Sequence, residues 1–164
     1  VGFAKAAGNY AAAMLATAEA RKQGYDQVLW MDAKEHQYVQ EIGTMNVFFI
    51  IGDTAITPDL SEGTILNGVT RSTAITVLKD MGLNVEERPL GIDEITEAYK
   101  NGTLKEAFGT GTAATISMIR ELRYKDFVMN FDTNTWQYCP KLKQIVTDIR
   151  EGRAADTHGW MFKV

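Results

Sequence analysis

The order of helical and extended patterns constrains the fold of this chain more than any other feature of its sequence. Four stretches have a helical pattern, and extended stretches lie between them, one of them rich in β-branched and aromatic residues. The helical stretches are residues 6–23, 70–81, 92–100 and 140–150. The extended stretches are residues 27–31, 37–51, 84–88 and 104–130, the last interrupted by Gly109-Thr110-Gly111 and by a turn at Tyr124-Lys125-Asp126. Because no strict strand–helix–strand alternation appears, the pattern predicts a mixed α/β (α+β) domain.

The composition of the chain excludes several classes of protein. The chain has 164 residues, enough for one domain, and 45% hydrophobic with 23% charged residues exclude a disordered tail. No apolar run approaches the roughly 20 residues that span a bilayer, and the net charge of −4 argues against a basic face for nucleic acid. A single cysteine, Cys139, excludes an internal disulfide framework and fits a reducing compartment, so we expect a cytoplasmic protein without a membrane partner. The two histidines, His36 and His158, are too far apart in sequence for a metal motif.

Lys5 is the only charged residue among the first 18, and its neighbours are glycine, alanine and aromatic or aliphatic residues. One interpretation is a side chain that reaches solvent from a loop. The other is an amine held in a pocket, where desolvation favours the neutral, nucleophilic form that Schiff-base chemistry requires.

Glu41 is the only acidic residue of the extended stretch 37–51. The alternation of that stretch predicts a strand that places Glu41 on one face with Val39, Gly43, Met45 and Val47. A buried carboxylate needs a partner, because an unpaired buried charge is costly. Glu41 is therefore either an edge-strand carboxylate that faces water or the partner of a buried cation, including one that belongs to a cofactor.

Two glycine-containing turns are candidate anion sites. The turn 66–71 leads into the helix expected from Thr70, a geometry that points backbone N–H groups and the positive helix end at an anion. The segment 109–113 has hydroxyls that can reach phosphate oxygens. Each alone also fits an ordinary loop. Together, a lysine for an aldehyde, a carboxylate for a basic ring nitrogen and two phosphate turns match pyridoxal 5′-phosphate.

The same segments carry a resemblance to a known family. They are Lys5-Ala6-Ala7-Gly8-Asn9-Tyr10, Gln40-Glu41-Ile42-Gly43-Thr44-Met45-Asn46, Leu66 to Arg71, Phe108 to Ala113 and His158-Gly159-Trp160. In this order and spacing the chain resembles the C-terminal part of the branched-chain amino acid aminotransferases, eukaryote-like branch, which are fold type IV pyridoxal phosphate enzymes. The resemblance implies their fold: a large C-terminal domain with a mixed sheet or pseudo-barrel and flanking helices.

The resemblance implies roles for residues around the cofactor ring. Lys5 is expected to bind the cofactor aldehyde covalently and to act as the catalytic base and acid. Tyr10 is expected to hydrogen-bond the phenolic oxygen of the ring. Glu41 is expected to keep the ring nitrogen protonated, and Leu66 to pack against the ring face.

The resemblance also implies the residues that hold the charged ends of cofactor and substrate. The amides of Val69 and Thr70 and the hydroxyl of Thr112 are expected to bind the phosphate. Thr44 and the amide of Ala113 are expected to receive the substrate carboxylate.

The implied activity is transamination of leucine, isoleucine and valine with 2-oxoglutarate, giving branched-chain 2-oxo acids and glutamate, in a homodimer. The opening at Val1 reads as the interior of a protein, with no signal peptide indicated. We therefore expect residues 1–164 to be the C-terminal cofactor-binding domain of a longer enzyme, inactive when alone, since an N-terminal domain supplies part of the family's site. Two alternatives stay open: another type IV enzyme (a D-amino acid aminotransferase or an aminodeoxychorismate lyase), or a non-catalytic ligand-binding or assembly domain.

Overall fold

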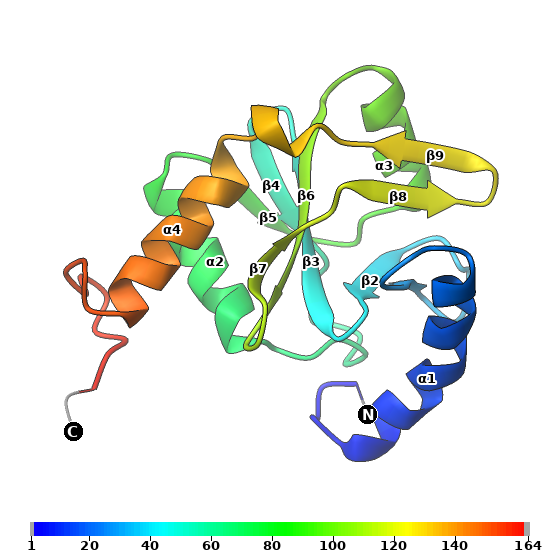
Figure 1. Ribbon diagram of the computed structural model, residues 1–164, viewed down its shortest axis with the longest axis horizontal. Coiled ribbons are helices and arrows are strands. Elements are labelled where there is room, and N and C mark those ends of the chain that lie inside the picture. The colour runs from blue at the N-terminus through cyan, green and yellow to red at the C-terminus, as the bar shows by residue number, and fades with distance from the viewer. Residues whose placement is uncertain (1, 163–164) are drawn as a thin grey trace.

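The computed structural model describes residues 2–162 and consists of a mixed sheet with helices on its faces and a separate hairpin (Figure 1). The helices are α1 (Ala7–Lys22), α2 (Val69–Asp80), α3 (Ile92–Lys100) and α4 (Tyr138–Arg150), with a short 3-10 helix at Thr133–Thr135. The strands are β1 (Leu29–Met31), β2 (Val39–Ile42), β3 (Met45–Ile51), β4 (Thr54–Thr57), β5 (Asn84–Glu87), β6 (Leu104–Gly111), β7 (Thr115–Met118), β8 (Glu121–Tyr124) and β9 (Phe127–Asn130).

Strand β3 organises the seven-stranded sheet, because it pairs with β2 and β4 along one edge and with β6 along the other. All pairings in this sheet are antiparallel except that of β4 with β5, which α2 connects as a crossover. Strands β8 and β9 form a second, two-stranded sheet. The predicted mixed α/β (α+β) class is confirmed.

The core has one apolar layer on each face of the sheet. Phe49 and Leu90 belong to the layer that α3 and the β8–β9 hairpin cover, and Phe48 and Phe108 to the layer under α2 and α4. The rings of Phe48 and Phe108 stack at a centroid distance of 5.3 Å. Residues 47–50 are fully buried because β3 has apolar partners on both faces, which explains its continuous apolar run.

Helix α1 is different, since none of its residues is buried and Met14 and Leu15 are more than two-thirds exposed. It runs beside β2 at the edge of the molecule (Figure 1). None of the helices in the described range 2–162 has the length and apolar character needed to cross a membrane.

Two expectations about the strands are wrong. The stretch 37–51 is two strands, because the chain reverses at Gly43-Thr44, so Glu41 does not share one continuous alternating face with Met45 and Val47. Gly109-Thr110-Gly111 lies inside β6, and the chain turns only at residues 112–114. Both glycines lie against Met45: a Cβ at Gly109 would be 2.9 Å from its side chain, and a Cβ at Gly111 would be 3.1 Å from it.

Candidate functional site

The β2–β3 hairpin positions the predicted carboxylate. Glu41 and Asn46 are register partners, and the turn between the strands contains Gly43, whose φ of +57° favours glycine. The indole N–H of Trp30, from β1, donates to the carbonyl of Gly43 at 2.9 Å. The turn that carries Thr44 is thereby fixed to the neighbouring strand.

Glu41 is half-buried and hydrogen-bonded through one oxygen. Its Oε1 accepts the side-chain amide of Asn46 and the backbone N–H of Leu66, both at 3.3 Å. Burial raises the pKa of Glu41, and the Leu66 N–H offsets part of that rise. Among the ion pairs of residues 2–162 none includes Glu41, so the described part of the chain supplies no cation for this carboxylate.

A cavity of about 450 Å³ lies beside Glu41, between α1, β1, β2 and the loop before α2. It brings together four of the predicted residues, Tyr10, Glu41, Thr44 and Leu66. Of these, Tyr10, Glu41 and Leu66 are half-buried and Thr44 is exposed. Residues from three distant parts of the sequence thus line one concave surface, as is usual for a small-molecule site.

Lys5 lies at the rim of this cavity. Gly2, Ala4 and Gly8 line the cavity on either side of Lys5 in sequence, whereas the Lys5 side chain is exposed and is not part of the lining. Of the two interpretations of Lys5, the described residues therefore match the side chain that reaches solvent. The physical reason is that α1, which follows Lys5, buries none of its own residues and leaves this rim open.

The predicted phosphate residues form a second group at the ends of α2 and β6. Val69 and Thr70 occupy the first turn of α2, one residue earlier than predicted, and no side chain caps that helix at Gly68. Thr112 and Ala113 are exposed in the β6–β7 turn. None of these four residues lines the cavity beside Glu41.

Two contacts of Asn46 connect the cavity beside Glu41 with the predicted phosphate residues at the ends of α2 and β6. Asn46 is the register partner of Thr110 near the end of β6, and its Oδ1 lies so close to Gly68 that a Cβ there would overlap it. The start of α2 is further fixed by buried Arg71, which donates to the carbonyl of Pro58 at 2.8 Å and pairs with Glu87 at 2.9 Å.

Sequence reasoning assigned no role in the site to three residues of this region, Trp30, Gln40 and Asn46. Trp30 and Gln40 line the cavity, and buried Asn46 hydrogen-bonds Glu41, which also lines it. A signal for Asn46 was available, because a polar residue at the start of a continuous apolar strand needs a hydrogen-bond partner.

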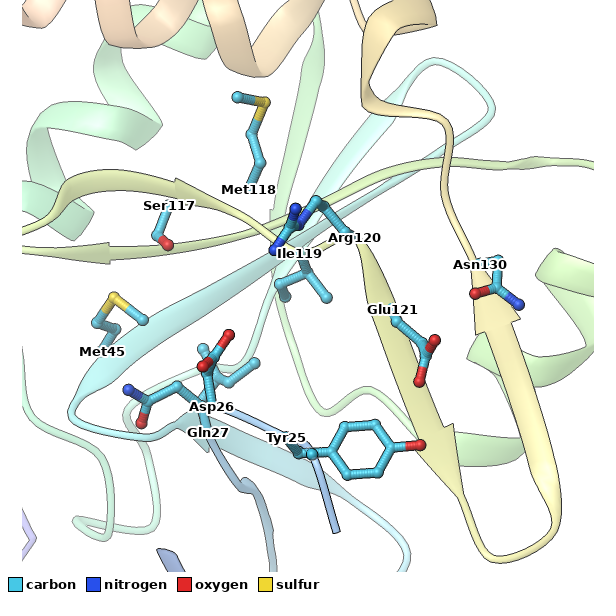
Figure 2. A pocket seen from close by; sticks show the side chains of 12 residues that line it. Tyr25, Asp26, Gln27, Met45, Ser117, Met118, Ile119, Arg120, Glu121 and Asn130 are labelled. Carbon is cyan, nitrogen blue, oxygen red and sulfur yellow. The ribbon is translucent and has the colours of Figure 1, made fainter. Parts of the chain in front are cut away.

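A larger cavity of about 580 Å³ contains none of the predicted residues. Figure 2 shows Met45 and Gln27 on one side of it and Ser117 and Arg120 on the other. Its lining mixes acidic, basic and apolar side chains without a convergent set. No group of three or more potential metal ligands occurs among the described residues.

The chain is similar in sequence and in structure to known aminotransferases. The family model for amino-transferase class IV matches residues 4–122. A probable branched-chain-amino-acid aminotransferase of Staphylococcus aureus is 48% identical over 161 residues, which are 98% of this chain and 45% of that protein. The chain thus spans less than half the length of this curated relative.

Solved structures of branched-chain amino acid aminotransferases have a similar fold. The Escherichia coli branched-chain amino acid aminotransferase superposes with a TM-score of 0.83 at 26% identity, over 99% of this chain and 50% of that one. The T.th. branched-chain amino acid aminotransferase complexed with N-(5′-phosphopyridoxyl)-L-glutamate gives a TM-score of 0.81 at 28% identity, over 98% of this chain and 50% of that one.

Proposed function

Because this chain belongs to the class IV aminotransferases, we propose that residues 1–164 are the C-terminal cofactor-binding domain of a branched-chain amino acid aminotransferase. The whole protein, meaning the longer chain that carries these residues, transfers amino groups from leucine, isoleucine and valine to 2-oxoglutarate. Similarity to proteins of that name over nearly the full length of this chain supports the substrate class. The resemblance also supports a cytoplasmic homodimer that acts on small amino and 2-oxo acids.

The observation that carries the proposal is the environment of Glu41. A half-buried carboxylate with a raised pKa and no cation from the described residues is costly unless a ligand provides positive charge. A protonated pyridine nitrogen provides that charge. The adjoining cavity is bounded by groups suited to the rest of a pyridoxal ring, the Tyr10 phenol and the Leu66 side chain.

The residues fit pyridoxal 5′-phosphate, which supplies, when bound, an electron-withdrawing ring that takes up the electron pair of the substrate α-carbon. Glu41 stabilises the positive charge on the ring nitrogen, since an adjacent carboxylate favours the protonated form. Tyr10 donates its hydroxyl hydrogen to the phenolic oxygen, and Leu66 excludes water from one ring face.

Lys5 has two roles in this proposal. Its amine would hold the cofactor through the aldehyde group. The Lys5 Nζ would also act as the base that takes the proton from the substrate α-carbon, and then as the acid that returns it. The exposed Lys5 side chain follows Ala4, which lines the cavity, so the backbone places its amine beside the proposed site.

The remaining residues fix the two anionic ends. The uncapped first turn of α2 presents the N–H groups of Val69 and Thr70 to the phosphate, and the Thr112 hydroxyl adds a donor. Thr44 and the N–H of Ala113, in the two exposed turns, receive the substrate carboxylate. We propose that residues 1–164 alone are inactive, because the family's N-terminal domain completes the pocket.

A substrate comparison tests the proposal. The whole protein is assayed for glutamate formation from L-leucine and 2-oxoglutarate, and for turnover of D-alanine and of aminodeoxychorismate. We expect turnover of L-leucine that is lost in Lys5→Ala and kept in Lys141→Ala, a matched change of an exposed lysine on α4. Turnover of D-alanine or aminodeoxychorismate instead of L-leucine would contradict the substrate class.

A further inference from the structure

We infer that Asn46 is a positioning residue that orients the Glu41 carboxylate toward the cofactor ring and couples it to the loop before α2. The inference rests on the proposed function, since it concerns how this chain prepares Glu41 for the ring nitrogen. Asn46 itself does not line the cavity, so it acts through other residues.

Hydrogen bonds join Glu41, Asn46 and Leu66 in one arrangement. The Asn46 Nδ2 donates to Glu41 Oε1 at 3.3 Å and to the carbonyl of Leu66 at 2.8 Å. The N–H of Leu66 donates to the same Oε1 at 3.3 Å. The buried side-chain amide of Asn46 thus joins Glu41, in β2, to Leu66, in a loop 25 positions further along the chain. It fixes the positions of these two proposed cofactor contacts relative to each other.

This arrangement leaves one oxygen of the Glu41 carboxylate without a hydrogen bond from residues 2–162. Both hydrogen bonds to the Glu41 side chain end on Oε1, and none from residues 2–162 reaches Oε2. The carboxylate is therefore fixed by one oxygen and presents the other. A ring N–H needs one strong acceptor in a defined direction, which a carboxylate held in this way supplies without reorientation.

Asn46 is also in close contact with Gly68. Asn46 is only 5% exposed, and a Cβ at position 68 would overlap its Oδ1. Gly68 precedes the first turn of α2, so Asn46 also sets the distance between Glu41 and the proposed phosphate site. Gly68→Ala should therefore displace Asn46 while leaving Asn46, Glu41 and Leu66 chemically unchanged.

The first measurement needs no cofactor. The whole protein, labelled with carboxyl-¹³C glutamate, is titrated by NMR, and Glu41→Gln identifies the Glu41 signal. Loss of a donor to the charged form raises a carboxyl pKa, so we expect a higher Glu41 pKa in Asn46→Ala and in Gly68→Ala. The double variant should show no further rise, because both changes remove the same hydrogen bond. An unchanged Glu41 pKa in both single variants would overturn the inference.

The second measurement compares two ligands of the cofactor-free protein. Pyridoxal 5′-phosphate has the ring nitrogen, and 1-deazapyridoxal 5′-phosphate has a carbon in its place. For Asn46→Ala we expect affinity for the first to fall about tenfold, as for loss of a hydrogen bond involving a charged group. Affinity for the analogue should stay the same, and Asn130→Ala, a matched change of an exposed asparagine, should alter neither.

The outcomes separate this inference from the proposed function. An equal loss for both ligands in Asn46→Ala would show a general structural defect and overturn the inference. A loss in Glu41→Gln without one in Asn46→Ala would overturn it while leaving the proposed function standing. If Glu41→Gln also binds both ligands like the unaltered protein, the proposed role of Glu41 fails and the inference falls with it.

Discussion

The carboxylate of Glu106, in β6, accepts the backbone N–H of Cys139, in the first turn of α4, at 2.7 Å. The same carboxylate accepts the N–H groups of Gln137 and Tyr138 at 2.7 and 2.8 Å. Glu106 is only 2% exposed, so a strand residue satisfies the otherwise unpaired N–H groups at the start of a distant helix. This contact fixes α4 over the layer that contains Phe48 and Phe108.

Glu106→Ala should destabilise the fold strongly, because it leaves three N–H groups without their acceptor. The expected loss is about 3 kcal/mol in the free energy of unfolding, measured by urea denaturation of the whole protein. Glu121→Ala, a change of an exposed glutamate on β8, is the control and should lie within about 0.5 kcal/mol of the unaltered protein. A similarly small effect for Glu106→Ala would contradict this account.

The Cys139 thiol should be inert in the folded protein. Burial, with the nearby Glu106 carboxylate, raises the pKa of Cys139 to about 12, so the reactive thiolate is scarce at a pH of about 8. Ellman's reagent should therefore label Cys139 only after denaturation. Labelling in the native state at the rate of a free thiol would show that α4 does not cover this residue.

Asp32 should make the fold sensitive to acid. Its carboxylate accepts backbone N–H groups of Glu35 and Tyr38, and also of Gln37 and Lys34, which hold the pKa of Asp32 well below its usual range. A depressed pKa gives a stabilising contribution that is present above the unfolded value of about 3.9 and is lost as pH falls below it.

The measurement is chemical denaturation at a series of pH values between about 5 and 2. Stability of Asp32→Asn should depend on pH less steeply than that of the unaltered protein over this range. Parallel curves for the two proteins would mean that Asp32 ionisation contributes nothing to the acid sensitivity.

A substitution in β6 tests why its glycines are there. The Cβ of Gly109→Ala would lie 2.9 Å from Met45 Cε and 3.1 Å from Ile42 Cγ2, so the Met45 side chain or the hairpin that carries it must shift. Overpacking of this kind costs about 1–3 kcal/mol. Combining it with Met45→Ala should recover part of that loss, as a double-mutant cycle of unfolding free energies would show. Additive losses would mean that Met45 is not the obstacle.

The helices and the turn at residues 124–126 were predictable from the sequence, whereas the turn at Gly43-Thr44 and the continuity of β6 through Gly109 were not. The ends of the predicted helices at 92–100 and 140–150 lie within two residues of α3 and α4, because their helical patterns are strong and local. Gly43 and Gly109 each interrupt an extended pattern. Gly43 adopts a positive φ in a turn, whereas Gly109 lies inside a strand and leaves room for the Met45 side chain. Only tertiary contacts distinguish these two uses of glycine.

The candidate site was predictable in part for a similar reason. Residue types suggested Glu41 as a carboxylate in need of a cation, and the structure places it half-buried without one from residues 2–162. Its bonds to Asn46 and Leu66 depend on strand register and on a loop 20 residues beyond Asn46, which no local pattern encodes. Exposure of Lys5 was one of two interpretations of the sequence, and the choice between them depends on how loosely α1 packs, which an alanine-rich composition does not specify.

Covalent trapping tests the central claim most directly. The whole protein is incubated with pyridoxal 5′-phosphate, reduced with borohydride and digested, and the modified lysine is identified by mass spectrometry. We predict a phosphopyridoxyl group on Lys5, both in the unaltered protein and in Tyr10→Phe and Glu41→Gln, which keep the amine. A label on another lysine, or none on the unaltered protein, would contradict the proposed site.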